Sequence, residues 1–236
     1  MKVLVNGCGG FMGREIIRLL GDDYFAGVDP AGEIKSLADA PKGADIIIDF
    51  SNHACTSDLL QYAAANKLPL VLATTGQTPE EKAAIADAAK EIPLFFAANY
   101  SIGITLLIQL AKKTAAAMPD AEIEIIEAHH DRKLDAPSGT ALAIANGIKE
   151  VRPNAEFNCG RSGQCKRTKD EIGISSIRLG NIVGDHEVMI GTQNETITLK
   201  HQAHSRSVFA DGAIAAARWL IDKPAGLYDM NSMIKF

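Results

Sequence analysis

The sequence lacks the features that tie a protein to a membrane, to nucleic acid or to a disulfide framework. Its 236 residues contain no apolar run near the roughly 20 residues of a membrane helix, and the N-terminus lacks the regions of a signal peptide. The net charge is −5, without a block of Lys and Arg. None of the four cysteines forms a C-x-x-C pair. We therefore expect a cytoplasmic protein with reduced thiols and with no nucleic-acid or membrane partner.

The first hundred residues alternate short apolar runs with helical patterns, which predicts a Rossmann-type doubly wound α/β domain. The segment Ile46–Ile48 is apolar at consecutive positions, as in a parallel sheet that is covered on both faces. Thr78, Pro79 and Glu81 together form a helix-start signal with a capping box. The predicted strands are Lys2–Asn6, Tyr24–Asp29, Ala44–Phe50, Leu68–Thr74 and Pro93–Ala98, and the predicted helices lie near Gly10–Leu20, Ala54–Asn66 and Pro79–Lys90.

After residue 100 the pattern changes to that of an α+β domain with an open mixed sheet, and we expect oligomerisation through its exposed face. Residues 151–172 are predicted to form a long loop, and Gln193-Asn194 a turn between two strands. Helices are predicted at Ile102–Ala117 and about Ser138–Glu150, and strands at Glu122–Ala128 and, antiparallel, at Gly173–Leu179, Asp185–Ile190 and Glu195–His201.

The end of the chain, with a helix at Val208–Ile221 followed by Gly226–Met230, is expected to return to the first domain. Residues 1–100 and 206–236 would then form a discontinuous dinucleotide-binding domain. Residues 101–205 would form the substrate-binding and oligomerisation domain.

A glycine cluster follows the first predicted strand. Gly7, Gly10 and Gly13 have G-x-x-G-x-x-G spacing, and Gly9 adds the second position of G-x-G. Glycine allows the tight turn and the close approach of a pyrophosphate, and the following helix directs its free N–H groups at the phosphates. A plain tight turn would also use glycine, but the strand–helix context favours dinucleotide binding.

Asp29 ends the second predicted strand, where a carboxylate can accept hydrogen bonds from the ribose hydroxyls of the cofactor. The alternative is a polar residue that merely ends a strand before Pro30. A carboxylate here repels the extra phosphate of NADP, and only Lys35 lies close behind it. NADH is therefore expected to serve at least as well as NADPH.

Two histidines and two cations fall within five positions in the stretch from His129 to Lys133. An imidazole is suited to hold a proton near neutral pH, and a nearby lysine can stabilise developing negative charge. Pro137 and Ser138 then begin a helix whose first N–H groups can bind a carboxylate. Together these features indicate a pocket for a small dianion. The alternatives are a metal site, which adjacent strand residues cannot easily share, or a solvated run of charges.

At this point the chain resembles the dihydrodipicolinate reductase family along essentially its whole length. The string His-His…Lys…Asp-Ala-Pro-Ser-Gly-Thr is highly specific to that family. The matching segments are Gly7–Gly13, Asp49–Ser51, Ala73–Gly76, Ala97–Ser101, Glu127–Ala141, Val183–His186, Ser205-Arg206, Phe209–Ala213 and Gly226–Met230.

The resemblance implies reduction of 4-hydroxy-tetrahydrodipicolinate to tetrahydrodipicolinate with NADH or NADPH, in the diaminopimelate route to lysine. It implies His129 as proton donor, Lys133 as a second catalytic group, and a homotetramer that closes by a hinge between domains. His130, Gly139 and Thr140 would bind the dicarboxylate substrate, with no metal. The residues implied to line the cofactor site are Gly7, Cys8, Gly9, Gly10, Phe11, Met12, Asp29, Ala73, Thr74, Thr75, Ala97, Ala98, Asn99 and Tyr100.

The chain departs from the family in two places. Many members carry Arg or Lys in the glycine loop, where this chain has Cys8 and Phe11, which strengthens the preference for NADH. The segment between Asp29 and Asp49 is short, so one element of the first domain could be trimmed. Two other functions stay open, namely another two-domain Rossmann dehydrogenase and a non-catalytic NAD(P)H-binding sensor.

Overall fold

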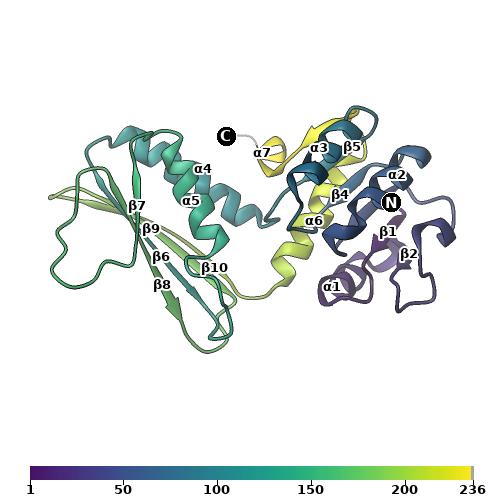
Figure 1. Cartoon of the computed structure of the whole chain (residues 1–236), viewed down its shortest axis with the longest axis horizontal. Helices are drawn as coiled ribbons and strands as arrows, with labels where there is room; N and C mark the ends of the chain where they lie inside the picture. The colour runs from purple at the N-terminus through teal and green to yellow at the C-terminus, as the bar shows by residue number, and fades with distance from the viewer. Residues whose placement is uncertain (235–236) are drawn as a thin grey trace. The chain divides into compact units, whose positions relative to one another are not determined.

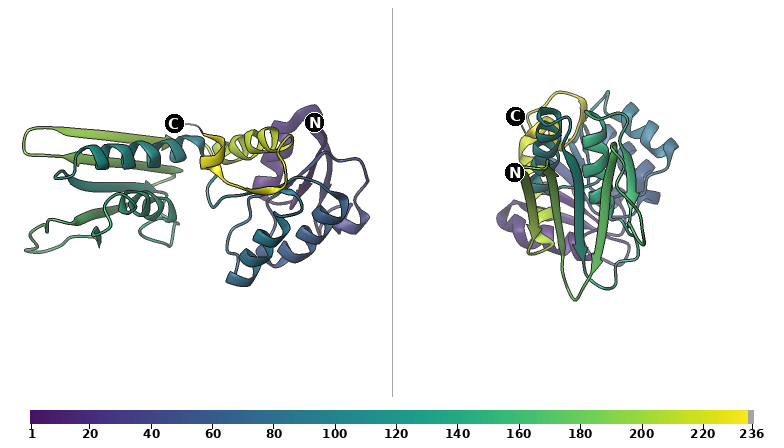
Figure 2. Two further views of the ribbon diagram at one scale, coloured as in Figure 1. Left: turned by 90° about the horizontal axis from the view of Figure 1, so that it is seen from above. Right: turned by 90° about the vertical axis from the view of Figure 1, so that its left-hand side faces the viewer.

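The structure is a computed structural model that describes residues 1–234, and it divides into two compact units. The first unit comprises Met1–Ile102 and the segment from Arg206 onward, and the second comprises Gly103–Ser205. Residues 235–236 of the predicted first domain lie outside the described residues. In Figures 1 and 2 the C-terminal segment, in yellow, lies with the purple and blue N-terminal elements. Each unit contains its own sheet and its own core.

The first unit is built on a six-stranded sheet with the order β11-β5-β4-β3-β1-β2. All of its strand pairs are parallel. The strands are β1 (Val3–Asn6), β2 (Tyr24–Val28), β3 (Ile46–Asp49), β4 (Leu70–Leu72), β5 (Pro93–Phe96) and β11 (Gly226–Tyr228). The last strand pairs with β5, so residues near the C-terminus complete the sheet that begins at residue 3.

Helices cover both faces of this sheet, because successive strand residues point to opposite faces and nearly all are apolar. Ile46 and Ile48 face the core formed with α1 (Phe11–Leu20) and α6 (Ser207–Leu220). Ile47 faces the opposite core, formed with α2 (Thr56–Asn66) and α3 (Pro79–Ala88). The predicted doubly wound arrangement is therefore confirmed (Figure 1). A short helix, α7 (Met230–Met233), follows β11.

The predicted start of α3 is confirmed in detail. The Thr78 hydroxyl accepts a hydrogen bond from the N–H of Glu81, and the Glu81 carboxylate accepts one from the N–H of Thr78. Between β2 and β3 the described chain contains only a short 3-10 helix, Leu37–Asp39. Two further 3-10 helices lie at Gly21–Asp23 and His53–Cys55.

The second unit contains a five-stranded sheet with the order β10-β9-β6-β8-β7. The predicted hairpin is confirmed, because β9 and β10 are antiparallel and the Thr192 N–H donates to the Glu195 carbonyl across the turn. The three later strands alternate in direction as predicted, but β8 does not pair with β9: it pairs with β6 and β7 and runs parallel to both. The strands are β6 (Glu122–His129), β7 (Glu156–Cys159), β8 (Glu171–Arg178), β9 (Gly184–Gly191) and β10 (Thr196–Ala203).

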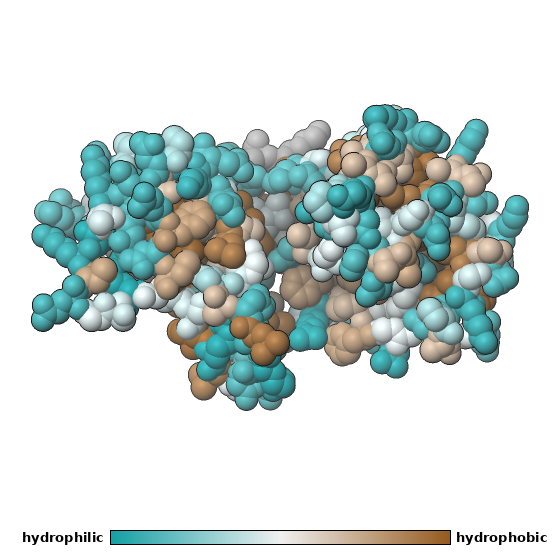
Figure 3. Space-filling model, in the orientation of Figure 1, coloured by the Kyte–Doolittle hydropathy of each residue, from teal (hydrophilic) through white to brown (hydrophobic). Residues whose placement is uncertain are grey.

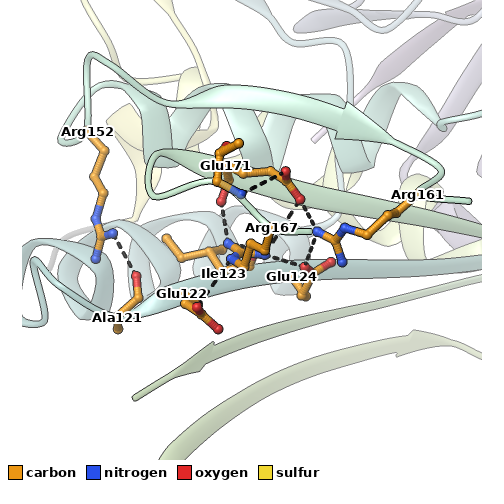
Figure 4. A network of polar contacts seen from close by, with 9 residues as sticks. Ala121, Glu122, Ile123, Glu124, Arg152, Arg161, Arg167 and Glu171 are labelled. Carbon is orange, nitrogen blue, oxygen red and sulfur yellow. Dashed lines mark hydrogen bonds and ion pairs between the residues drawn. The ribbon is translucent and has the colours of Figure 1, made fainter. Parts of the chain in front are cut away.

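The predicted long loop at 151–172 is also wrong in part, since β7 lies within it and β8 begins at Glu171. Between β7 and β8, the remaining part of this segment carries two arginines of a network of ion pairs (Figure 4). Arg161 and Arg167 both contact Glu124 on β6, and both also pair with Glu171. β7 itself pairs with β8 at the edge of the sheet, and its Phe157 packs against the core.

Both long helices of the second unit pack on the same face of its sheet. Helices α4 (Ile102–Ala117) and α5 (Gly139–Lys149) bury Leu107, Ala111 and Ile144 against β-strand residues such as Ile125 and Val188. The guanidinium of Arg152 donates two hydrogen bonds to the carbonyl of Ala115, near the C-terminal end of α4. No helix in the described part of the chain is long and apolar enough to cross a membrane.

Candidate active site

The loop between β1 and α1 has the geometry of a phosphate-binding turn. Gly7 has φ = +79°, and a Cβ there would lie 2.5 Å from the carbonyl oxygen of Phe50. A Cβ on Gly13 would lie 2.1 Å from the carbonyl oxygen of Gly7, so only glycine allows α1 to pack this closely. Gly10 is the N-cap of α1, and no side chain caps the helix. The first N–H groups of α1 are therefore available to an anion.

Two adjoining cavities flank this loop within the first unit. Their volumes are about 710 Å³ and about 350 Å³, and four lining residues are common to both: Gly10, Phe50, Ser51 and Asn52. The larger cavity is also lined by Asp29 and Lys35. The smaller one is lined by Phe11, Met12 and the segment Ala73–Thr75. Such an elongated space along a glycine loop is suited to a dinucleotide.

The carboxylate of Asp29 lies against the glycine loop. One of its oxygens accepts a hydrogen bond of 3.0 Å from the N–H of Gly9, and the other accepts one of 3.0 Å from the N–H of Ala31. These contacts fix the carboxylate at the wall of the larger cavity, beside the position of Lys35. The structure thus places Asp29 where a ribose could reach it.

Two further predicted cofactor segments follow β4 and β5, at the carboxyl ends of neighbouring parallel strands. Only the first, Ala73–Thr75, lines a cavity described above, whereas Ala97, Ala98, Asn99 and Tyr100 line neither. The Tyr100 ring is buried in the core, and its hydroxyl donates to the Leu72 carbonyl at 2.9 Å. Tyr100 therefore supports the strands that carry the site.

Asp49, at the end of β3, organises this edge of the sheet and was given no role from the sequence. Its buried carboxylate accepts hydrogen bonds from Asn6 (2.7 Å), Ser51 (2.6 Å) and Thr74 (2.5 Å). Burial raises the pKa of Asp49, although these hydrogen bonds oppose the change. A carboxylate directly after three isoleucines is the signal that could have revealed it.

In the second unit, the carboxyl end of β6 carries a buried acid–imidazole pair. Glu127 and His129 are two positions apart, so both side chains point to the helix-covered face of the sheet. The Nδ1 atom of His129 lies 2.5 Å from Oε2 of Glu127, whose side chain is fully buried. A carboxylate in this position favours a proton on Nδ1 and leaves Nε2 for exchange with a ligand.

Arg178, from β8, holds the Glu127 carboxylate with two hydrogen bonds of 2.9 and 2.8 Å. Oε1 of Glu127 also accepts a 3.1 Å hydrogen bond from the N–H of Ser138. Burial alone would raise the pKa of Glu127, but hydrogen bonds from Arg178, Ser176, His129 and Ser138 outweigh it and lower that pKa to about 2. The carboxylate is therefore ionised at neutral pH.

His186, from β9, completes the cluster. In the sheet it pairs with Glu127, and its ring packs edge-on against that of His129 with centroids 5.2 Å apart. Its Nε2 lies 3.2 Å from the Ser138 hydroxyl. Burial, with the nearby His129, lowers the pKa of His186 to about 4, so this ring is neutral at pH 7.

The loop between β6 and α5 brings the remaining predicted residues to the same end of the sheet. Lys133 forms a 2.8 Å ion pair with Asp135, and the Asp135 carbonyl accepts a hydrogen bond from Arg178. Ser138 caps α5 by accepting from the N–H of Ala141. A Cβ at Gly139 would have no neighbour within 4 Å, so the turn before Thr140 is open.

Leu134 and Leu179, near the carboxyl ends of β6 and β8, are 98% and 63% exposed in this unit. Figure 3 shows hydrophobic residues among hydrophilic ones at this end of the second unit. Among the described residues, no group of three His, Cys, Asp or Glu side chains is arranged to hold a metal ion. The groups at this end of the sheet that can act on a ligand are the imidazole of His129, the side chain of Lys133 and the N–H groups at the start of α5.

The sequence reasoning identified His129, Lys133 and the turn at Ser138, but not the partners that join them. Glu127, Arg178 and His186 received no role, although Glu127 and His129 have the i, i+2 spacing of one strand face. Arg178 and His186 come from strands that are far away in the sequence. Their involvement depends on the sheet register, which no local pattern fixes.

Comparisons with known proteins agree along the whole chain. Two family profiles match, "Dihydrodipicolinate reductase, N-terminus" over residues 1–100 and "Dihydrodipicolinate reductase, C-terminus" over residues 103–234. Proteins named 4-hydroxy-tetrahydrodipicolinate reductase from Caldanaerobacter subterraneus subsp. tengcongensis and Clostridium tetani are 41% and 42% identical. The alignments cover 100% and 99% of this chain and 98% and 97% of those proteins.

Solved structures lead to the same family. The dipicolinate-bound dihydrodipicolinate reductase from Paenisporosarcina sp. TG-14 superimposes with a TM-score of 0.80 at 25% identity, covering 100% of this chain and 99% of that one. A myo-inositol dehydrogenase from Corynebacterium glutamicum, with a TM-score of 0.60 at 16% identity and coverage of 96% and 90%, shares the fold. On its sequence and its structure, this chain belongs to the dihydrodipicolinate reductase family.

Proposed function

We propose that the chain reduces 4-hydroxy-tetrahydrodipicolinate to tetrahydrodipicolinate with NAD(P)H, in the diaminopimelate route to lysine. The observation that carries this proposal is the arrangement around Glu127. One buried carboxylate binds both the ring of His129 and the N–H of Ser138, the N-cap of α5, so the proposed proton donor and the proposed anion-binding turn share one anchor. Curated relatives at 41% and 42% identity carry the name of this reductase.

The residues of the first unit fit a nicotinamide dinucleotide. The glycine loop leaves no room for a Cβ at Gly7 or Gly13, and the uncapped start of α1 presents N–H groups to the pyrophosphate. Asp29 would accept hydrogen bonds from the ribose, while Thr74 and Thr75 line the smaller cavity. When bound, NAD(P)H supplies the hydride.

The residues of the second unit fit the other half of the reaction. The substrate loses its hydroxyl group as water, and the resulting double bond, conjugated to an imine, gains a hydride at one carbon and a proton at its neighbour. His129 would hold that proton at Nε2, and Lys133 would stabilise the developing charge. The N–H groups of Gly139 and Thr140 would bind one carboxylate, with His130 as a further contact.

A coupled assay tests this proposal. Dihydrodipicolinate synthase generates the unstable substrate in the cuvette, and NADH oxidation is followed by absorbance. We expect oxidation only when the synthase and both of its substrates are present. A non-catalytic sensor would bind NADH without turnover, and a dehydrogenase for another substrate would show no dependence on the synthase.

We further infer that NADH serves at least as well as NADPH. Asp29 places a negative charge at the wall of the larger cavity, where the 2′-phosphate of NADPH would have to lie. The glycine loop offers Cys8 and Phe11 at positions where a cation could have met that phosphate. Lys35 lines the same cavity and offsets part of this repulsion, so NADPH should still bind.

We also propose that the protein works in the cytoplasm as a homotetramer. Helices α4 and α5 pack on one face of the second sheet, and the other face carries the half-buried Ile126 and Met189 and the exposed Ile177. Apolar residues on a bare sheet face favour association. Four unpaired cysteines suit a reducing compartment. Light scattering tests the tetramer, and a monomeric mass in dilute solution would contradict it.

A further inference from the structure

We propose that Glu127 is a positioning residue that fixes both the proton donor and the carboxylate-binding turn through one buried carboxylate. The inference rests on the proposed function, and it concerns how His129 and the start of α5 keep the same alignment. Without such a shared anchor, a strand end and a helix start joined by a loop of nine residues, 130–138, could move independently.

The Glu127 carboxylate binds both of these elements, and Arg178 and Ser176 on β8 hold the carboxylate itself. Oε2 binds Nδ1 of His129 at 2.5 Å and an Arg178 nitrogen at 2.9 Å. Oε1 binds the N–H of Ser138 at 3.1 Å and the other terminal nitrogen of Arg178 at 2.8 Å. The two-point contact with Arg178 prevents rotation of the carboxylate, so the two oxygens keep their separate partners.

The contact with His129 determines which nitrogen exchanges its proton. A carboxylate at Nδ1 holds a proton on that nitrogen, which leaves Nε2 as the donor atom. The space beside Nε2 is kept open by Gly184, where a Cβ would lie only 3.1 Å from this nitrogen. Any larger residue at 184 would crowd the donor atom.

The contact with Ser138 orients the anion-binding turn. The Ser138 N–H is held by Glu127, and its hydroxyl accepts from the N–H of Ala141 and contacts Nε2 of His186. Ser138 is thus fixed at both its backbone and its side chain. Its position determines where the next two N–H groups, those of Gly139 and Thr140, point. His186 is therefore a second positioning residue, acting through Ser138.

The charges around His129 come from several elements. Arg178 on β8 lies behind Glu127, His186 on β9 packs against the ring, and Lys133 and Asp135 occupy the following loop. His201 on β10 and Asp185 on β9 lie near enough to His186 to influence it. The charged group in direct contact with Nδ1 of His129 is the carboxylate of Glu127.

The test is the pH–rate profile of Glu127→Gln, which keeps the shape of the side chain and removes its charge. A proton donor works only while protonated, so activity falls at high pH. We expect the alkaline limb of kcat to move toward lower pH by about one unit, the scale for loss of one adjacent opposite charge. The kcat at pH 8 should fall about tenfold, and binding of pyridine-2,6-dicarboxylate should weaken several-fold. Binding of NADH to the first unit should not change.

Two further variants keep the test decisive. Glu150→Gln breaks the exposed Lys112–Glu150 pair in the same unit and should leave the profile unchanged. If Glu127→Gln does not fold, Glu127→Gln with Arg178→Gln leaves no unpaired buried cation and gives the same readings. A folded variant with the wild-type alkaline limb overturns this inference alone. An inactive wild type in the coupled assay overturns the proposed function instead.

Discussion

In the proposed reaction, the imidazole of His129 and the carboxylate of Asp29 have separate tasks, one in proton transfer and one in the choice of cofactor. Each is held in place by a specific hydrogen-bond partner. His129 is bound by Glu127 on the same strand face, and Asp29 is bound by the N–H of Gly9 in the glycine loop. Single substitutions at these positions should therefore affect different kinetic constants.

The substitution His129→Gln removes the proton donor while keeping a polar side chain of similar length. We expect kcat to fall about 10²–10⁴-fold, the usual scale of acid–base assistance, with little change in NADH binding. Steady-state kinetics with synthase-generated substrate measure the effect. His204→Gln, at an exposed position, is the matched control. An unchanged kcat for His129→Gln would refute the role of proton donor.

The substitution Asp29→Ser removes the negative charge beside the ribose site. We expect kcat/KM with NADH to fall and kcat/KM with NADPH to rise, because the carboxylate no longer binds hydroxyls or repels a phosphate. Both constants are measured for the wild type and for Asp22→Ser, an exposed control. A hundredfold preference of the wild type for NADPH would contradict the role given to Asp29.

At the scale of the elements, most helices and strands follow from local patterns. Helix α4 begins and ends at the predicted residues, and the capping box at Thr78 is present. Strand β7 was missed because its four residues, of which Phe157 packs against the core, are too few to show a period. The neighbours of β8 in the sheet are β6 and β7, a pairing that periodicity cannot specify.

Removal of the N-cap of α3 tests how much the start of one helix contributes to the stability of the protein. Thr78→Ala deletes the hydroxyl that accepts from the N–H of Glu81, and we expect a loss of about 1 kcal/mol in the free energy of unfolding. Thr78→Ser keeps the hydroxyl and should cost much less. Denaturant unfolding followed by circular dichroism measures both variants. Equal stability of Thr78→Ala and wild type would show that the cap contributes nothing.

At the scale of the whole molecule, the two units divide the chemistry between them. The glycine loop, Asp29 and both cavities belong to the first unit, and the cluster around Glu127 belongs to the second. The sequence identified the chemical groups in each unit because they lie in short motifs. It did not identify Asp49, Arg178 or His186 as partners, because burial and strand register create those contacts.

The buried groups of the second unit make stability depend on pH. The folded pKa of His186 is lowered from 6.5 to about 4, so the unfolded chain binds its proton first as the pH falls. The folded pKa of Glu127 is lowered from 4.5 to about 2, which has the same sign at lower pH. The free energy of unfolding should therefore fall from pH 6.5 to 4 through His186, and further below pH 4.5 through Glu127.

Unfolding measured across this range, for the wild type and for His186→Asn, checks the effect. The variant should lose stability overall and show a shallower slope between pH 6.5 and 4, because it lacks the titrating ring. His204→Gln serves again as control, since its ring is exposed. Identical slopes for wild type and His186→Asn would contradict the buried, neutral state of His186.

The central step of the proposed reaction is the transfer of a hydride from the nicotinamide to the cyclic dicarboxylate. The direct measurement supplies NADH deuterated at the transferred position of C4, together with synthase-generated substrate, and analyses the product by mass spectrometry. We expect tetrahydrodipicolinate that carries the cofactor's deuterium, formed at a rate that His129→Gln reduces. Oxidation of the cofactor without deuterium in this product, or no product at all, would contradict it.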